Sequence, residues 1–225
     1  RNHGFAYRAG WWIGRAIIAF LVLSVGLTVL YKFVPVPVTA TMLMDPNGFT
    51  KDWTSLDDID RNMVDAAIAG EDAKFCLHSG FDEDAILTAW RRNQQGGRIR
   101  GGSTISQQTA KNVFLWQGRS WPRKVMETVY TPMIEALWSK RRIVEVYLNV
   151  AEFGRGVFGV HAAAEYYFKT TPDKLSLRQA AALASILPAP RQRNPQTGSA
   201  RTRSIAGGAQ TIQADGRDSC LVLQP

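Results

Sequence analysis

The sequence has few of the residues that build metal sites and covalent crosslinks. Two cysteines, Cys76 and Cys220, occur in 225 residues, which excludes a disulfide-rich mini-protein and a cysteine-rich zinc module. Three histidines, His3, His78 and His161, are too few and too scattered for a histidine-clustered metal site. Alternation of apolar and polar residues is scarce and no internal repeat is present, so we expect a mostly α-helical fold.

Acidic residues are absent from positions 1–44, and the net charge of +8 is unevenly spread. Residues 45–190 hold 18 basic and 17 acidic residues, so the central part of the chain lacks the excess of positive charge typical of a nucleic-acid-binding domain. This part is itself polarised, with 11 acids and 3 bases in residues 45–84 and 11 bases and 2 acids in residues 91–142. The basic segment favours an anion, which could be a phosphate, a membrane lipid or a nucleic acid.

Sixteen residues from Ala16 to Tyr31 carry no charge. The longer apolar stretch, residues 11–33, is sufficient to cross a hydrocarbon core of about 30 Å as a helix. We therefore predict one transmembrane helix there and favour it over a cleavable signal peptide, because no small-residue cleavage pattern precedes Pro35. Basic residues are enriched before the span, which predicts that residues 1–10 are cytoplasmic and that the rest of the chain lies outside.

Capping residues and helical spacing predict several helices in the domain that we place at residues 34–195. They are expected from the Ser55–Asp58 capping box to Glu71, over 82–90, from 103 or 104 to 114, after Ser120, over 140–149, over 159–168, and from Ser176 to Pro188. Residues 196–225 lack an apolar pattern and are expected to be a divergent, disordered tail. We expect Cys76 to be a packing residue, and a bond to Cys220 is possible.

Glu71 ends an apolar helical pattern and is a candidate general base. A carboxylate beside apolar surface has a raised pKa, which suits proton abstraction. The alternative is that Glu71 is an ordinary solvated helix end, and the helix alone does not decide between the two.

Glycines lead into a polar helix that starts near Ser103, and free N–H groups at such a start attract anions. Ser103, Gln107 and Lys111 share one helical face, and Gln108 and Asn112 share the next. An exposed polar helix is the alternative.

Positive charge continues after this helix. Arg119, Arg123, Lys124 and Glu127 follow at spacings that bring the last three to one helical face. A surface ion pair is one interpretation. The other is a cationic site for a diphosphate, in which the carboxylate orients the cations or a metal ion.

Four blocks in this order resemble the peptidoglycan glycosyltransferases over about residues 34–190. They are Glu71-Asp72-x-x-Phe75-x-x-His78-x-Gly80, Gly102-Ser103-Thr104-x-x-Gln107-Gln108-x-x-Lys111-Asn112, Arg123-Lys124-x-x-Glu127, and Lys140-x-x-Ile143-x-Glu145-x-Tyr147-Leu148-Asn149. The resemblance implies a mostly α, lysozyme-like glycosyltransferase domain with a small membrane-proximal jaw, preceded by one transmembrane helix. The sequence after Pro195 departs from the family pattern.

The resemblance implies polymerisation of lipid II into β-1,4-linked glycan strands, with inversion and release of undecaprenyl diphosphate. Glu71 matches the base and Glu127 the second essential carboxylate, which could act through a diphosphate-bound Mg²⁺. The implied substrate-binding residues are Asp72, Phe75, His78, Ser103, Thr104, Gln107, Gln108, Lys111, Asn112, Arg119, Arg123 and Lys124. The implied location is the bacterial inner membrane, with the catalytic domain in the periplasm.

Expected partners are lipid II, the growing glycan strand, membrane lipid and other cell-wall synthesis or division proteins, and no nucleic acid. A glycan hydrolase is a rival interpretation, but lytic enzymes usually follow the catalytic Glu with Ser, where this chain has Asp72. A non-enzymatic membrane scaffold is the second rival, and it would not need Glu71 together with Glu127. The sequence contains no Ser-x-x-Lys, so we predict no transpeptidase.

Overall fold

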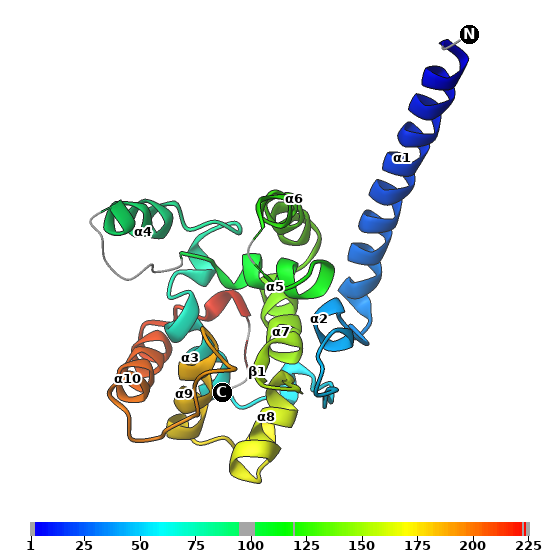
Figure 1. The fold of residues 1–225 in the computed structure, drawn as a ribbon. Helices are drawn as coiled ribbons and strands as arrows, with labels where there is room; N and C mark the ends of the chain where they lie inside the picture. The colour runs from blue at the N-terminus through cyan, green and yellow to red at the C-terminus, as the bar shows by residue number, and fades with distance from the viewer. Residues whose placement is uncertain (1–2, 95–101, 119, 222, 224–225) are drawn as a thin grey trace. The chain divides into compact units, whose positions relative to one another are not determined.

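The computed structural model describes residues 3–94, 102–118, 120–221 and 223. The chain divides into two compact units, residues 1–35 and residues 36–225. The first unit is helix α1 (His3–Phe33), and the second holds the remaining elements that Figure 1 labels.

Helix α1 contains a segment of 27 residues, Tyr7–Phe33, in which an 18-residue window has a mean hydropathy of 2.3. At 1.5 Å per residue this segment reaches about 40 Å, which exceeds the thickness of a hydrocarbon core. Large apolar side chains such as Trp12 and Leu23 are exposed along it. Among the described residues this is the one helix long and apolar enough to cross a membrane, and it includes the span of residues 11–33 that the sequence predicts.

The second unit is built mainly from helices, as the sequence predicts. Its α-helices are α2 (Ala40–Leu43), α3 (Arg61–Glu71), α4 (Glu83–Gln94), α5 (Ile105–Phe114), α6 (Trp121–Leu137), α7 (Lys140–Val150), α8 (Gly159–Phe168), α9 (Leu177–Ile186) and α10 (Ala200–Asp215). Its 3₁₀ turns are η1 (Leu56–Asp58), η2 (Phe75–Leu77), η3 (Pro172–Lys174) and η4 (Ser219–Leu221). Strands β1 (Glu152–Gly154) and β2 (Val157–Phe158) form an antiparallel hairpin.

Most helix starts follow the capping residues in the sequence. Thr104 and Ser176 each form a capping box, with Gln107 and Gln179 respectively. The expected capping box at Ser55 is wrong, because Ser55 makes no side-chain capping bond and precedes only the turn η1. Helix α3 starts later, where the Asp60 side chain accepts a hydrogen bond from the Asn62 N–H.

Helices α3, α9 and α10 pack against one another (Figure 1). Small residues allow the close approach: Ala180–Ala184 of α9 is fully buried. A Cβ added at Gly70 of α3 would lie 3.4 Å from Ile205 Cδ1 and 3.7 Å from Ala184 Cβ. This packing fixes the end of α3, where Glu71 lies.

The expectation of a disordered tail over residues 196–225 is wrong. Ser199 caps α10, and Thr202, Ile205, Ala209 and Ile212 form its buried face. This face was missed because the apolar positions between residues 200 and 215 are few and are separated by Gly, Ser, Gln and Arg. The burial comes from partners distant in sequence, α3 and α9.

A disulfide joins Cys76 of η2 to Cys220 of η4, with a Cα–Cα distance of 5.6 Å. The bond that the sequence left possible is therefore present, and Cys76 is a crosslinked residue as well as a packing one. The end of the chain is also held by an Arg61–Asp218 ion pair of 2.7 Å and by the fully buried Leu221. These contacts fasten the C-terminal segment to the turn that follows Glu71.

We expect loss of the disulfide to lower the free energy of unfolding. The bond spans 144 residues, and crosslinks of long loops stabilise proteins by about 3 kcal/mol, chiefly by restricting the unfolded chain. Chemical denaturation of the detergent-solubilised wild type and of the Cys76→Ser, Cys220→Ser double variant would measure this. Reductant should destabilise the wild type and leave the variant unchanged; equal stability of the two proteins would contradict the expectation.

Asp65 lies inside α3 with a fully buried side chain, 3.5 Å from Arg61 Nε. Burial raises the pKa of this carboxyl to about 7, and the Asp218 charge adds to the rise, while Gln213 and Arg61 oppose it. The folded protein therefore retains a proton that the unfolded chain releases at its ordinary pKa of about 3.9. The stabilisation from this group is complete below the unfolded pKa and is lost as the pH rises through about 7.

Asp65→Asn removes this titration. We expect the variant to gain stability relative to the wild type between pH 5 and pH 8, by on the order of a few kcal/mol. Urea unfolding at a series of pH values measures the difference. Asp52→Asn, an exposed site in the same unit, is the control, and a difference between Asp65→Asn and wild type that does not change with pH would contradict the assignment.

Candidate active site

Glu71 occupies the last turn of α3, and its carboxylate is held by one hydrogen bond. Gln108 Nε2 of α5 donates to Glu71 Oε2 over 2.8 Å. The other oxygen, Oε1, is buried without a hydrogen-bond partner among the described residues. Burial raises the pKa of Glu71, while Gln108 and the charges of Arg201, Lys111 and Arg193 oppose the rise. A carboxylate of raised pKa with a vacant acceptor oxygen is suited to accept a proton.

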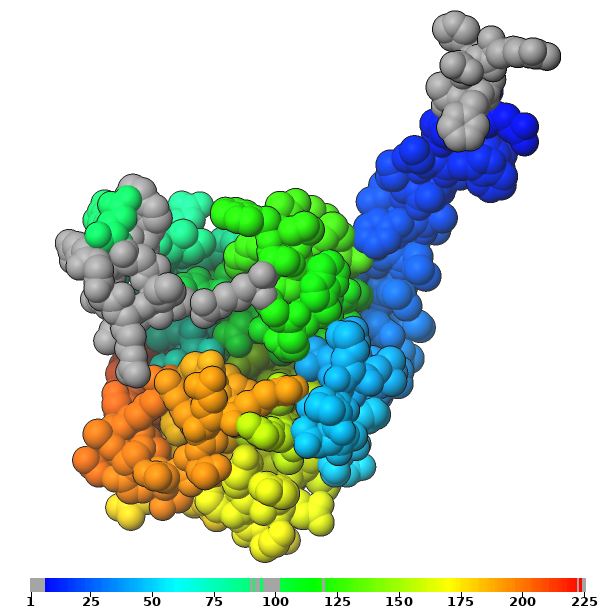
Figure 2. Space-filling view, viewed as in Figure 1, coloured from blue at the N-terminus to red at the C-terminus, as the bar shows by residue number. Residues whose placement is uncertain are grey.

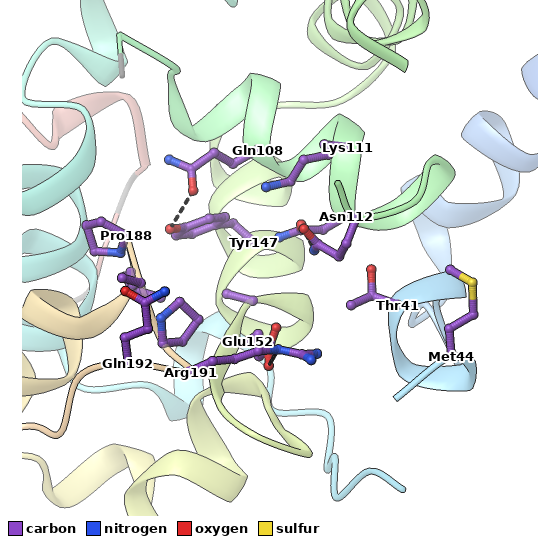
Figure 3. Close-up of a pocket in the computed structure, with 15 residues that line it drawn as sticks. Thr41, Met44, Gln108, Lys111, Asn112, Tyr147, Glu152, Pro188, Arg191 and Gln192 are labelled. Atoms are coloured by element: carbon purple, nitrogen blue, oxygen red, sulfur yellow. Dashed lines mark hydrogen bonds and ion pairs between the residues drawn. The ribbon is translucent and has the colours of Figure 1, made fainter. Parts of the chain in front are cut away.

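Gln108 is itself oriented by α7. The Tyr147 hydroxyl donates to Gln108 Oε1 over 3.4 Å, and the dashed line in Figure 3 marks this bond. Tyr147 is 1% exposed, and burial together with the Glu71 charge raises the pKa of its phenol. Tyr147, Gln108 and Glu71 thus form a chain of hydrogen bonds that runs across three helices.

Asp72, next to Glu71, is buried and is occupied by protein partners. Its Oδ2 accepts from the Ile105 N–H at the start of α5 over 2.9 Å, and its Oδ1 lies 2.8 Å from His78 Nε2. Because the Gly80 N–H donates to His78 Nδ1, the ring proton lies on Nε2 and is donated to Asp72. Asp72 and His78 were both expected to bind substrate. In the structure, their contacts hold the end of α3 to the start of α5 and so support the site.

Three further residues expected to bind substrate also have contacts within the protein. Phe75 is fully buried, with Lys140 Nζ 4.5 Å from the centre of its ring. Thr104 donates to the Gly80 carbonyl and accepts from the Gln107 N–H, and Gln107 Oε1 accepts from the Thr104 N–H. Gln107 is therefore occupied by the capping box, although its helical spacing places it with Ser103 and Lys111.

The cationic residues gather around Glu127 in α6. Its Oε2 accepts from Arg123 Nη1 over 2.8 Å, and its Oε1 pairs with Lys124 Nζ. Lys111 of α5 lies close enough for the charges of Glu127 and Arg123 to affect its pKa, which burial lowers. Lys124 retains 42% side-chain exposure, so the group presents positive charge that the single carboxylate does not cancel. Arg119 lies outside the described residues.

The contacts of Glu127 leave no free carboxylate oxygen for direct binding of a metal ion. Both of its carboxylate oxygens are bound by cationic side chains, and no group of three His, Cys, Asp or Glu residues suitable for a metal occurs in the part of the chain that the structure describes. The residues present therefore do not fit a metal site built by protein ligands alone. Mg²⁺ is often held through substrate phosphates, but we derive no step from such an ion.

A pocket of about 540 Å³ lies beside α5 and α7 (Figure 3). Gln108, Lys111, Asn112 and Tyr147 form one wall, and residues 187–192 form another. Thr41 and Met44, in and just after α2, complete the pocket at a third side. The pocket therefore contains Lys111 and Asn112, two predicted site residues that can bind anions or sugars. Its other walls, Thr41, Met44 and residues 187–192, were not predicted from the sequence.

The walls of this pocket are joined by Arg191. Its Nη2 lies 2.8 Å from Asp45 Oδ2, and its Nε lies 2.6 Å from Glu152 Oε1. Figure 2 shows the light-blue segment around residue 45 against the orange segment that follows α9. No sequence motif indicated Asp45, Glu152 or Arg191. Their ion pairs form only when folding brings distant parts of the chain together.

Two other residues were also missed. Arg193 Nη1 and Arg201 Nε both donate to the Ser185 carbonyl, over 3.2 Å and 3.1 Å, and both charges act on Glu71. Arg193 and Arg201 come from the region interpreted as the end of the domain and a tail.

The chain is similar to known proteins over most of its length. A family model described as Transglycosylase matches residues 39–212. Biosynthetic peptidoglycan transglycosylase from Jannaschia sp. (strain CCS1) is 46% identical over 217 residues, covering 93% of this chain and 89% of that protein. The proteins of the same name from Pasteurella multocida (strain Pm70) and Caulobacter vibrioides are 50% and 44% identical, covering 78% and 90% of this chain and 76% and 93% of their own lengths.

We expect Asp72→Asn to destabilise the second unit by about 1–3 kcal/mol, because the amide that replaces one oxygen would face the His78 or Ile105 N–H. Denaturant unfolding measures the change. Asp58→Asn makes the same substitution at an exposed position and should change the stability by less than about 0.5 kcal/mol. Equal effects of the two substitutions would show that the Asp72 contacts contribute little.

Proposed function

Because the chain belongs to the transglycosylase family, we propose that it polymerises lipid II into β-1,4-linked glycan strands and releases undecaprenyl diphosphate. Its lysozyme-like fold and family place it among the glycosyltransferases that act on peptidoglycan. The observation that carries the proposal is the combination of Glu71, whose Oε1 has no hydrogen-bond partner among the described residues, with Lys111, whose charge acts on Glu71, and with the cations Arg123 and Lys124 around Glu127.

Glu71 is the general base in this proposal. The 4-hydroxyl of the acceptor sugar attacks the anomeric carbon of the lipid-linked donor, and its proton passes to Glu71 Oε1. The vacant acceptor and the raised pKa support this role. Gln108, which binds the other oxygen, fixes the direction in which Oε1 points. Attack opposite the leaving group inverts the anomeric centre from α to β.

The leaving diphosphate gains negative charge as the anomeric bond breaks, and fixed cations that face this charge lower the barrier. Lys111 and Lys124 supply them, while Glu127 holds Arg123 and Lys124 in place. This assigns the two carboxylates different roles: Glu71 exchanges a proton, and Glu127 is the counterion that positions Arg123 and Lys124.

The apolar helix α1 supports a membrane location for the enzyme. We propose that it anchors the chain in the bacterial inner membrane with its N-terminus in the cytoplasm, since basic residues precede the span. The lipid tail of the substrate would then remain in the bilayer beside the enzyme. A small jaw near the membrane, contacts with membrane lipid and with other cell-wall synthesis or division proteins belong to the same proposal.

Replacement of the base tests the mechanism. We expect the detergent-solubilised wild type to polymerise lipid II and Glu71→Gln to lose roughly 100- to 10,000-fold in rate, as measured by gel separation of labelled strands. Because the base must be ionised, the wild-type rate should fall at acid pH, with a midpoint above the ordinary glutamate pKa of about 4.3.

Glu83→Gln is the matched control, because it makes the same change at an exposed position in α4. It should retain the wild-type rate. Polymer from Glu71→Gln at the wild-type rate would remove Glu71 as the base and keep the function. A folded wild type that makes no polymer would reject the proposed function.

A further inference from the structure

A second, smaller hollow of about 250 Å³ adjoins the pocket beside Lys111. The two share the residues Pro190 and Arg191 in their walls. Arg191 is held there by Asp45 and Glu152, so the boundary between the hollows is fixed. The second hollow therefore lies next to the first one, and Tyr166 and Tyr167 near the end of α8 line it in place of Gln108 and Lys111.

The lining of this hollow is cationic and aromatic. It contains Arg155, Arg193, Tyr166 and Tyr167 and no carboxylate side chain. Neither Arg155 nor Arg193 forms an ion pair with another residue that the structure describes, whereas Arg191 has its charge balanced by two carboxylates. A guanidinium binds a carboxylate through two parallel hydrogen bonds, and a tyrosine ring offers an apolar face for a sugar.

Backbone geometry holds these side chains in place. A Cβ at Gly154 would lie 2.6 Å from the Tyr167 hydroxyl, which donates to the Phe153 carbonyl over 3.0 Å. Only glycine permits this contact. Gly156 has a φ of +71°, and a Cβ there would lie 2.9 Å from the Gly48 carbonyl oxygen. The turn between β1 and β2 is thus fixed with Arg155 at its tip, and Arg155 lines the hollow together with Tyr166, a residue that is 62% exposed.

The proposed reaction indicates that the growing glycan strand is the ligand of this hollow. The diphosphate end of the donor is held near Lys111 and Lys124, so the sugars already joined must extend away from that end. The first pocket, at about 540 Å³, is the size of an ordinary ligand site, and a longer strand extends beyond it. The hollow on the other side of the shared Pro190–Arg191 wall is lined by Arg155 and Tyr166.

We propose that this second hollow is an exit subsite that binds a carboxylate-bearing disaccharide-peptide unit of the growing strand. The inference rests on the proposed function. Arg155 and Arg193 bind the carboxylates, and Tyr166 packs against a sugar ring. Holding the strand at a second point keeps its reactive end near the active site between additions, because rebinding is then intramolecular. The subsite therefore favours long strands.

Strand length is the first test. Arg155→Glu and Tyr166→Ala change exposed side chains, so both proteins should fold. We expect each variant to shorten the strands severalfold in the lipid II assay, with the loss concentrated in later additions and a much smaller effect on the first condensation. Arg178→Glu, an exposed charge reversal in α9 outside both hollows, is the matched control and should give strands of wild-type length.

Binding of soluble fragments is the second test, and it does not depend on turnover. Calorimetry would compare a tetrasaccharide-peptide fragment that has free carboxylates with the same fragment after amidation. We expect the full-length wild type to bind the free acid about tenfold more tightly, as for one charge-assisted hydrogen bond, and Arg155→Glu to lose this preference.

Strands of wild-type length from Arg155→Glu, or equal affinity of the wild type for both fragments, would overturn the exit subsite. An equal loss in the first and later condensations would also overturn it, because the residues would then act in the reaction itself. A wild type that makes no polymer would instead reject the proposed function, and the fragment titration would still decide whether the hollow binds carboxylates.

Discussion

The Asp72 carboxylate joins the end of α3 to the start of α5, and the geometry of the site depends on this link. One oxygen accepts the first free N–H of α5, and the carboxylate also binds the His78 ring. Negative charge is stabilised at a helix N-terminus, so the bond is also favoured by the helix dipole. Glu71 precedes Asp72 in the chain, and Gln108 follows Ile105 by one turn. Fixing Asp72 on Ile105 therefore fixes the Glu71–Gln108 hydrogen bond.

The two carboxylates of the site are distinguished by their surroundings. Glu71 is half-buried, its Oε1 is buried without a hydrogen-bond partner among the described residues, and burial raises its pKa. Glu127 is more deeply buried, and both of its oxygens are paired with cations. A buried charge with full pairing is retained, whereas an incompletely paired one can exchange a proton. Two carboxylates of one active site can take different roles in this way, one in proton transfer and the other in electrostatic stabilisation, because their surroundings differ.

Features of the fold that depend on neighbouring residues were predictable from the sequence. The apolar run of α1, the caps at Thr104 and Ser176, and the helical spacing of α5 and α7 are all local. The same spacing did not show that Gln107 serves its own helix start while Gln108, one position later, reaches Glu71. Which of two adjacent amides faces the site is decided by the helices packed around α5.

Features that need distant partners were not predictable. Helix α10 buries only a few apolar residues, and its stability comes from contact with α3 and α9. Arg191 joins Asp45 to Glu152 across more than a hundred residues of sequence, and no spacing rule reaches that far. The ordered blocks identified candidate site residues, but they did not distinguish those that line the pocket from those that support it. That distinction required burial and hydrogen-bond partners.

The Cys76–Cys220 bond turns most of the second unit into a covalent ring. The chain between the two cysteines includes Lys111, Glu127 and Tyr147. Glu71 precedes Cys76 in the sequence, in the part of the chain that begins with α1. A single proteolytic cut anywhere between the two cysteines would leave both fragments attached to each other. The base, the cationic group and the apolar anchor would remain parts of one molecule after such a nick, provided that the disulfide stays oxidised.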